Sequence, residues 1–215
     1  MGNTGRLFII VTLFILFSSG LHAQEGENLN AFLADDSPAL MFQVSDLSLQ
    51  SWNGGVGMMF SASEDVHWRF SLSPKFSGSD NSSSDTVYGP SEDNSTRLGV
   101  GISGGRFCVL YRKGSLCITA GPEVGYVYTN ESRKQSRRNI IQSETTTGTH
   151  LLSLSGTFGA GYALSTTVML HAEYLLGASY SFSSSDNTQA YGVVAVERSD
   201  WSLASSARLG LMIRL

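Results

Sequence analysis

The sequence predicts an all-β protein, an eight-stranded antiparallel up-and-down transmembrane β-barrel. Three observations predict it. Apolar and polar residues alternate with a period of two along eight stretches, short turns alternate with long polar connections, and charged residues keep to one face of each stretch. A closed sheet of this kind leaves no unpaired backbone edge in hydrocarbon.

Eight stretches carry the alternation, and they include two weaker ones at 39–48 and 53–62. The clearer stretches are 66–77, 98–111, 116–128, 152–164, 168–182 and 201–215. Within 98–111 the apolar phase changes at Gly104-Gly105, which predicts a glycine-bearing bulge there. After that bulge, Phe107 and Val109 are expected on the apolar face.

The connections fall into two kinds. Tight turns are predicted at 63–65, 112–114 and 165–166, and long polar loops at 79–95, 131–148 and 183–200. Alternation of the two kinds is typical of transmembrane barrels, which have short turns on one rim and long loops on the other. The short connection at 49–52 must share the rim of the long loops. The apolar stretch 191–196 is expected to extend a strand beyond the membrane, with a partner-binding patch as the alternative.

The first 23 residues differ from the rest of the chain. Arg6 is their only charged residue, the apolar run at 7–17 has the length of a signal-peptide core, and Leu21-His22-Ala23 offers a cleavage site. We predict a cleaved signal peptide at 1–23, an N-terminal segment at 24–38 and the barrel at 39–215. A retained membrane anchor is the alternative, although such a helix needs about 20 apolar residues. The segment 24–38 is expected to be either a disordered tail or a partial plug.

Composition narrows the function classes. The formal net charge is −4 and 15% of residues are charged, so the chain lacks the basic surface that a nucleic-acid partner requires. No apolar run after residue 23 is long enough for a spanning helix. A membrane barrel and a soluble secreted barrel that binds a small apolar ligand remain as candidates.

Charge placement decides which face points outward. An eight-stranded interior is just wide enough for side chains to fill, so it cannot hold the bulky apolar face. That face is therefore predicted to contact lipid. The opposite face is small and polar, and it carries Arg69, Lys75, Arg106, Glu123, His171, Glu173, Arg208 and Arg214. Aromatic residues near the strand ends are expected to form interfacial girdles, namely Trp68, Tyr126, Tyr128, Tyr180, Phe182 and Trp201.

The chain resembles the small eight-stranded outer-membrane proteins of Gram-negative bacteria, the porin-like or outer-membrane-protein-A-like barrels. The signal peptide, "GPEVGYVY", "LHAEYLLGASYSF" and the terminal alternating strand carry the resemblance. It implies a monomer in the outer membrane, with residues 24–38 in the periplasm. Its implied partners are outer-membrane lipid, lipopolysaccharide and the barrel-assembly machinery. Many members end on an aromatic residue that this machinery reads, and the chain departs from them by ending on Leu215.

The lumen charges are predicted to form a hydrogen-bonded network that fills the barrel, with a proton or ion path as the alternative. A wide pore is not expected, because open channels need about 16 strands. The predicted members are Arg69, Arg106, Glu123, His171, Glu173, Arg208 and Arg214.

The pair His171 and Glu173 is the one place where a base and an acid share a face two residues apart. The outer-membrane lipid A deacylases and palmitoyltransferases resemble the chain in fold, and they need a serine with a histidine and an acid near the acyl chains. Here both residues face the lumen, and no His-x-Ser pair is present. We therefore predict a non-enzymatic protein, with an outer-membrane lipid-modifying hydrolase as the alternative.

Two cysteines flank one tight turn. If Arg112 and Lys113 form a two-residue turn, Cys108 and Cys117 lie opposite each other on the lumen face and are predicted to form a disulfide; a three-residue turn ending in Gly114 would break that register. Two cysteines and scattered histidines do not make a zinc ligand set, so no metal or cofactor is predicted.

One predicted outer loop is strongly basic, because Arg133, Lys134, Arg137 and Arg138 lie close together in it. Guanidinium groups bind phosphate in a bidentate manner, which favours contact with lipopolysaccharide head groups. A solvated loop without a partner is the alternative. The expected role is envelope structure or surface interaction through the outer loops.

Overall fold

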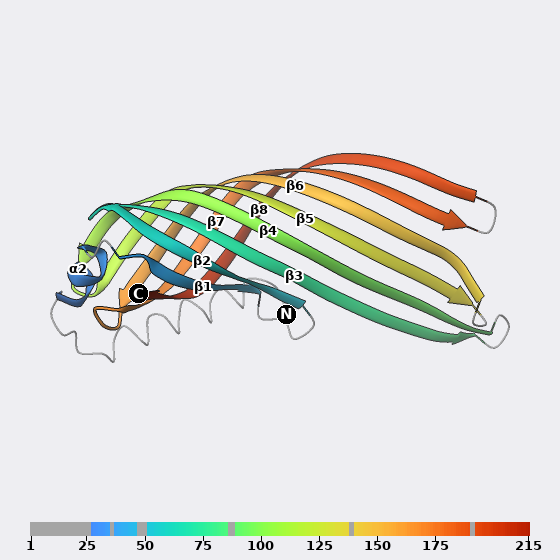
Figure 1. The fold of residues 1–215 in the computed structure, drawn as a ribbon, viewed down its shortest axis with the longest axis horizontal. Coiled ribbons are helices and arrows are strands. Elements are labelled where there is room, and N and C mark those ends of the chain that lie inside the picture. Colours follow the sequence, from blue (N-terminus) through green and yellow to red (C-terminus); the bar gives the residue numbers. More distant parts are fainter. Residues whose placement is uncertain (1–26, 35–36, 47–50, 86–88, 138–139, 190–191) are drawn as a thin grey trace.

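A computed structural model shows, among the residues that it describes, a closed barrel of eight antiparallel strands with a short helix at one end (Figure 1). It describes residues 27–34, 37–46, 51–85, 89–137, 140–189 and 192–215, so the predicted signal peptide lies outside the described residues. Helix α2 (Glu27–Ala34) comes first. The strands are β1 (Ala39–Asp46), β2 (Ser51–Ser63), β3 (Val66–Asp85), β4 (Gly89–Lys113), β5 (Leu116–Arg137), β6 (Ile140–Ala163), β7 (Val168–Gln189) and β8 (Gly192–Arg214).

Each strand pairs with its sequence neighbours, and β1 pairs with β8 to close the ring. The predicted fold class is confirmed. Tight turns join β2 to β3, β4 to β5 and β6 to β7. In the second of these, Gly114 has a φ of 59°, a left-handed conformation that glycine adopts without a steric penalty.

The predicted long loops are wrong, because the described residues of these segments continue the strands. The ladder between β3 and β4 runs without interruption to the pair Asp85–Gly89, and β5–β6 and β7–β8 extend in the same way (Figure 1). Outside a membrane both faces of a sheet meet water, so a strand there needs no apolar alternation, and threonine-rich sequence such as 145–149 favours strands. The predicted extension of a strand through 191–196 is confirmed from Gly192 onward.

The predicted bulge at Gly104-Gly105 is also wrong. Strand β4 stays in register with β3 through both glycines, and its register with β5 shifts only between Val109 and Tyr111. The ring of Phe107 is therefore buried inside the barrel, and Arg106 is exposed on the outside. Gly105 makes room for this ring, since a Cβ there would lie 2.8 Å from it.

The outer surface of the barrel carries the bulky apolar side chains. Leu154 and Leu176 are 61% and 63% exposed, while Arg69 and Glu123 are each 4% exposed inside. This arrangement is the reverse of a soluble barrel that binds an apolar ligand in its interior. Within the described residues, no helix has the length and apolar character that crossing a membrane requires.

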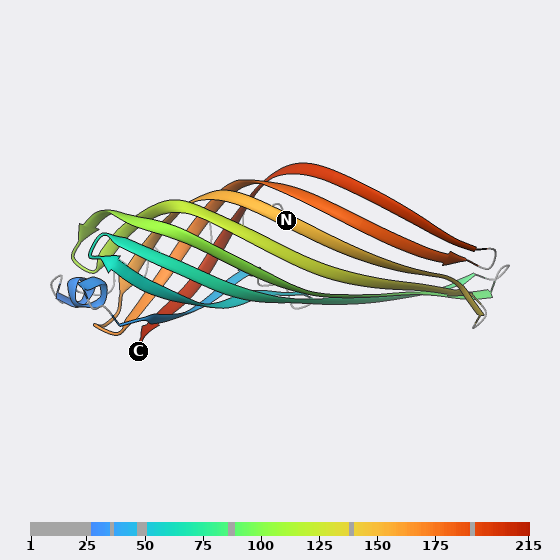
Figure 2. The same cartoon turned by 45° about the horizontal axis from the view of Figure 1, so that its top comes forward.

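Helix α2 closes the end of the barrel that also holds the tight turns and the C-terminus (Figure 2). Its apolar residues Leu29, Phe32 and Leu33 are buried against an apolar layer inside the barrel, which comprises Ala39, Met41, Met59, Cys117, Ala163, Met169 and Met212. Arg214 Nε donates a hydrogen bond of 2.9 Å to the carbonyl oxygen of Phe32 in the last turn of α2. A cation at a helix C-terminus is favourable. Two alternatives were predicted for 24–38, a disordered tail and a partial plug. Residues 27–34 form a partial plug.

Candidate functional site

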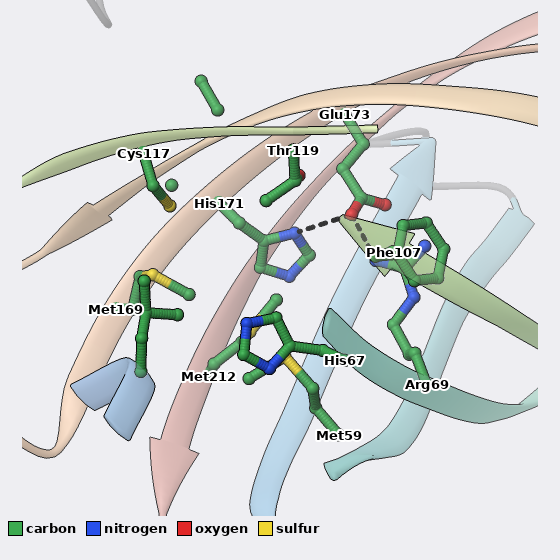
Figure 3. Close-up of a pocket in the computed structure, with 13 residues that line it drawn as sticks. Met59, His67, Arg69, Phe107, Cys117, Thr119, Met169, His171, Glu173 and Met212 are labelled. Carbon is green, nitrogen blue, oxygen red and sulfur yellow. Dashed lines mark hydrogen bonds and ion pairs between the residues drawn. The ribbon is translucent and has the colours of Figure 1, made fainter. Parts of the chain in front are cut away.

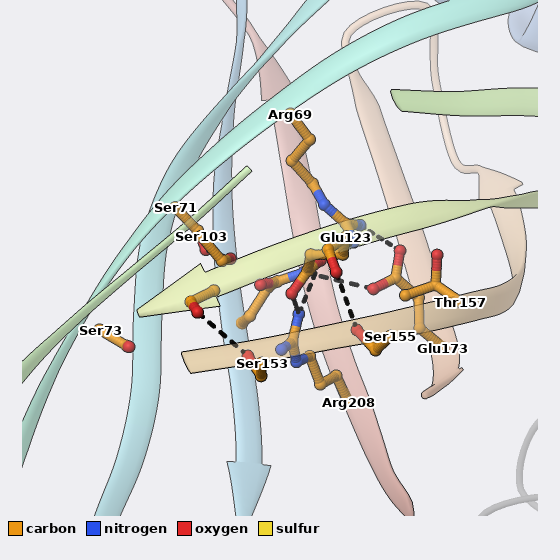
Figure 4. Close-up of polar contacts among 12 residues, drawn as sticks. Arg69, Ser71, Ser73, Ser103, Glu123, Ser153, Ser155, Thr157, Glu173 and Arg208 are labelled. Carbon is orange, nitrogen blue, oxygen red and sulfur yellow. Dashed lines mark hydrogen bonds and ion pairs between the residues drawn. The ribbon is translucent and has the colours of Figure 1, made fainter. Parts of the chain in front are cut away.

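The centre of the barrel holds a charge cluster, which comprises the buried Arg69, Glu123 and Glu173 and the half-buried Arg208. Strands β3, β5, β7 and β8 each contribute one inward-pointing member (Figure 4). Arg69 lies between the two carboxylates: one guanidinium nitrogen donates to Glu123 over 2.8 Å and the other to Glu173. Arg208 donates to both oxygens of Glu123, at 2.8 and 3.1 Å.

Two further side chains contact the charge cluster. The ring of Phe107 lies 3.9 Å from Arg69 Cζ, a cation–π contact, and Gln43 Nε2 donates to Glu173 over 3.5 Å. Two guanidinium groups and two carboxylates give no net charge, and each charge has a partner. A buried ionic group needs such compensation.

The structure brings together only part of the predicted lumen network. Arg69, Glu123, Glu173 and Arg208 form the charge cluster. His171 lies beside it, but its Nδ1 is 3.8 Å from Glu173 Oε1, beyond hydrogen-bond distance. Placing Arg106 in the lumen is wrong, because β4 has no bulge before this residue. Arg214 faces inward but binds α2 instead.

The predicted disulfide is wrong, and both cysteines are free. The turn between β4 and β5 consists of residues 114–115, because Lys113 pairs with Leu116. Cys117 then lies opposite Arg112, and Cys108 lies opposite Ala120.

Small hydroxyl side chains line the lumen next to the charge cluster (Figure 4). Ser71 and Ser103 share a hydrogen bond of 2.7 Å, and Thr157 donates to the carbonyl oxygen of Gly121 over 2.8 Å. These groups satisfy their hydrogen bonds within the wall, as a buried polar layer requires.

A small cavity of about 30 Å³ lies between the charge cluster and helix α2 (Figure 3). Its lining includes His67, His171, three methionines and Cys117. The imidazole of His171 lies directly over Gly210 of the neighbouring strand.

Gly210→Ala is expected to destabilise the barrel by about 1–3 kcal/mol, since a Cβ there would lie 2.0 Å from His171 Nε2 and 2.5 Å from the carbonyl oxygen of Phe42. Urea unfolding in detergent micelles measures this change. Gly156→Ala is the control, because its nearest neighbour would be 4.0 Å away. Equal stabilities for the two variants would contradict the placement of His171.

The strands beyond the apolar surface carry paired charges. Arg133 Nε donates to Asp93 over 2.8 Å, Lys134 lies 3.1 Å from Glu144, and Arg97 binds Glu131. Two of the four basic residues predicted to contact lipopolysaccharide are thus already paired within the chain. The side chain of Arg137 and residue 138 lie outside the described part of the chain.

Acidification is expected to weaken the outer strands locally. Hydrogen bonds from Arg133 hold the pKa of Asp93 below its ordinary value of 3.8. The stabilisation from a carboxylate with a lowered pKa is present above the unfolded-state pKa and is lost as pH falls through the folded-state pKa, here below about pH 4. A carboxyl NMR titration measures the shift, and Arg133→Gln should return the pKa of Asp93 toward 3.8. An unchanged pKa in that variant would refute the pairing.

Comparisons with known proteins concern the fold alone. No family model matches the chain, and no curated protein does. A major outer membrane protein from Thermus thermophilus has a TM-score of 0.50 at 13% identity, over 83% of this chain and 98% of that one. CarO of Acinetobacter baumannii has a TM-score of 0.39 at 13% identity, over 86% and 99% of the two chains. Ail, the attachment invasion locus protein of Yersinia pestis, has a TM-score of 0.38 at 10% identity, over 83% and 97%. With its closed ring of eight strands and its outward apolar surface, the chain has the fold of the small outer-membrane β-barrel proteins.

Proposed function

We propose that the chain is a monomeric, non-enzymatic protein of the Gram-negative outer membrane that interacts with partners through its outer strands. The observation that carries this role is the extension of six strands beyond the apolar surface as one curved sheet (Figure 2). We call this extension, residues 78–85, 89–97, 130–137, 140–149, 183–189 and 192–200, the outer sheet.

The outer sheet has two edges. The ladder between β2 and β3 ends at the pair Ser51–Ser77, and the ladder between β1 and β8 ends at Val44–Leu209. Beyond these pairs, β3 and β8 have one ladder neighbour each among the described residues. An unpaired strand edge presents backbone donors and acceptors that can bind a further strand.

The edge of β8 supports an extended polypeptide as the partner. Val194 and Val196 are exposed on it, and β-branched side chains favour pairing with another strand. Lipopolysaccharide has weaker support, because a phosphate would have to displace Asp93 from Arg133 and Glu144 from Lys134.

A displayed library of nine-residue peptides, selected against the protein in nanodiscs, tests this role. Bound peptides should be rich in alternating β-branched residues, and Val194→Lys/Val196→Lys should weaken their binding at least tenfold. The control Ser184→Lys/Thr188→Lys adds the same charge to β7, which is not an edge, and should bind as the unmodified protein does. Equal binding by the edge variant would overturn the proposal. So would binding to lipopolysaccharide micelles alone that is lost when Arg133, Lys134, Arg137 and Arg138 become glutamine.

The filled lumen predicts that the barrel neither conducts nor hydrolyses lipid. The charge cluster lies across the lumen, α2 closes one end, and His171 is buried inside, away from the lipid-facing surface. Planar-bilayer recordings should therefore show no steady pore current, and lipid A should stay intact. A steady current, or a lipid hydrolysis that His171→Ala abolishes, would contradict this part of the proposal.

A further inference from the structure

The cavity between the charge cluster and α2 contains an unusual set of side chains. Of the six methionines in the sequence, Met41, Met59, Met169 and Met212 are buried in this part of the barrel. Three of them line the cavity together with two histidines and a cysteine, and Figure 3 shows these side chains around one space: Met59, Met169, Met212, His67, His171 and Cys117. We call this space the sulfur cavity.

The two histidines leave buried ring nitrogens without partners. Among the described residues, neither nitrogen of His171 nor Nε2 of His67 has a hydrogen-bond partner, although the two side chains are only 4% and 2% exposed. The other nitrogen of His67 lies 3.2 Å from Ser61 Oγ. A buried polar group without a partner costs about 1–3 kcal/mol, so these nitrogens favour a ligand in the cavity.

Glycines in the wall allow the sulfur atoms to approach one another. A Cβ on Gly161 would lie 2.8 Å from Cys117 Sγ and 2.9 Å from Met169 Sδ, so both sulfurs pack on this glycine. Gly210 makes the same room for the ring of His171. Imidazole nitrogens and sulfur donors are thereby placed around one space.

The donor set selects the class of metal. Among the described residues, no three His, Cys, Asp or Glu side chains lie close enough to hold a metal ion, so any site here depends on thioether sulfur. Zinc sites use thiolate, imidazole and carboxylate ligands, whereas thioether ligands select Cu(I). The adjacent charge cluster has no net charge, and the cation of Arg214 lies near His67, since both contact Ser61 Oγ. A monovalent ion is therefore easier to accommodate than a divalent one.

We propose that the sulfur cavity binds a soft monovalent cation, Cu(I), through a subset of the donors that line it, drawn from the nitrogens of His67 and His171 and the sulfurs of Met59, Met169 and Met212. Cys117 adds a fourth sulfur at the same wall. The volume of about 30 Å³ suits a single ion without a hydration shell or one or two waters. A test must therefore distinguish bound Cu(I) from bound water in this cavity.

The test titrates folded protein in detergent with Cu(I) under anaerobic conditions, in competition with bicinchoninate. Every variant carries Cys108→Ala, which removes the thiol outside the cavity. The expected result is one Cu(I) per chain. Met59→Leu/Met169→Leu/Met212→Leu keeps the volume of the side chains, and it should bind at least a hundredfold more weakly. The control Met58→Leu changes a methionine outside the cavity and should bind as the parent does.

X-ray absorption gives a second readout. Bound Cu(I) should show both nitrogen and sulfur scatterers, and His67→Gln/His171→Gln should lose the nitrogen component. Migration on an unboiled gel confirms that each variant is folded. Failure to compete with bicinchoninate, or equal affinity of the triple leucine variant and its parent, would overturn the proposal and leave the cavity as a water site.

Discussion

Arg69→Met is expected to lower the free energy of unfolding by about 3–5 kcal/mol, the cost of leaving a buried ionic group without its partner. Arg69 lies between Glu123 and Glu173 and also contacts the ring of Phe107. Without it, Glu173 keeps a hydrogen bond from Gln43, and Glu123 keeps Arg208. Urea unfolding in micelles, followed by the gel shift between folded and unfolded protein, measures the loss.

The matched control is Arg97→Met, which breaks the outer pair with Glu131. Because Arg97 is 53% exposed, this change should cost no more than about 1 kcal/mol. Equal losses for the two variants would show that the central charges are not shielded from water, and the filled-lumen account would fail.

Leu154→Arg is expected to cost about 2–4 kcal/mol in a bilayer, the penalty for an arginine on the lipid face of a barrel near the midplane. Leu154 faces outward, and its ladder partners are Val124 and Ala178, both in the middle of the barrel wall. Unfolding from lipid vesicles in urea measures the change.

Thr146→Arg is the control, because residue 146 is exposed on the same strand and the same face but lies in the outer sheet. Its effect should be within about 0.5 kcal/mol, as for other exposed positions. A loss at residue 146 as large as that at residue 154 would place the hydrocarbon boundary elsewhere.

The alternation of apolar and polar residues predicted the barrel, because one face of each membrane strand must contact lipid. Along β7, Tyr174 and Leu176 must face hydrocarbon, so His171 and Glu173 face the lumen, and no tertiary information is needed to see this. The outer sheet was not predicted, because no lipid contact imposes this alternation on its strands. Beyond the membrane both faces are polar, and serine-rich strand sequence there cannot be distinguished from a loop.

The residues of the candidate site could be predicted wherever inward and outward side chains alternate along a strand without a bulge. Arg69, Glu123, Glu173 and Arg208 follow from this alternation directly. Arg106 and Phe107 were assigned to the wrong faces because the bulge position depends on how β4 pairs with two neighbours at once.

The contact between Arg214 and Phe32 joins residues far apart in the sequence, and no local pattern could reveal it. The sulfur cavity was missed for a similar reason. Its methionines come from β2, β7 and β8, and only closure of the barrel brings them together.

The central claim is that the apolar face of each strand contacts hydrocarbon. Nitroxide labels at single cysteines along residues 150–158, in a Cys108→Ala/Cys117→Ala background and in lipid vesicles, test it directly by their collision rates with oxygen and with a water-soluble nickel chelate. The account predicts high oxygen and low nickel collision rates at 152, 154 and 158, with lower oxygen rates at 153, 155 and 157. Labels at 152, 154 and 158 that are shielded from both reagents, in protein that stays folded without detergent or lipid, would contradict it.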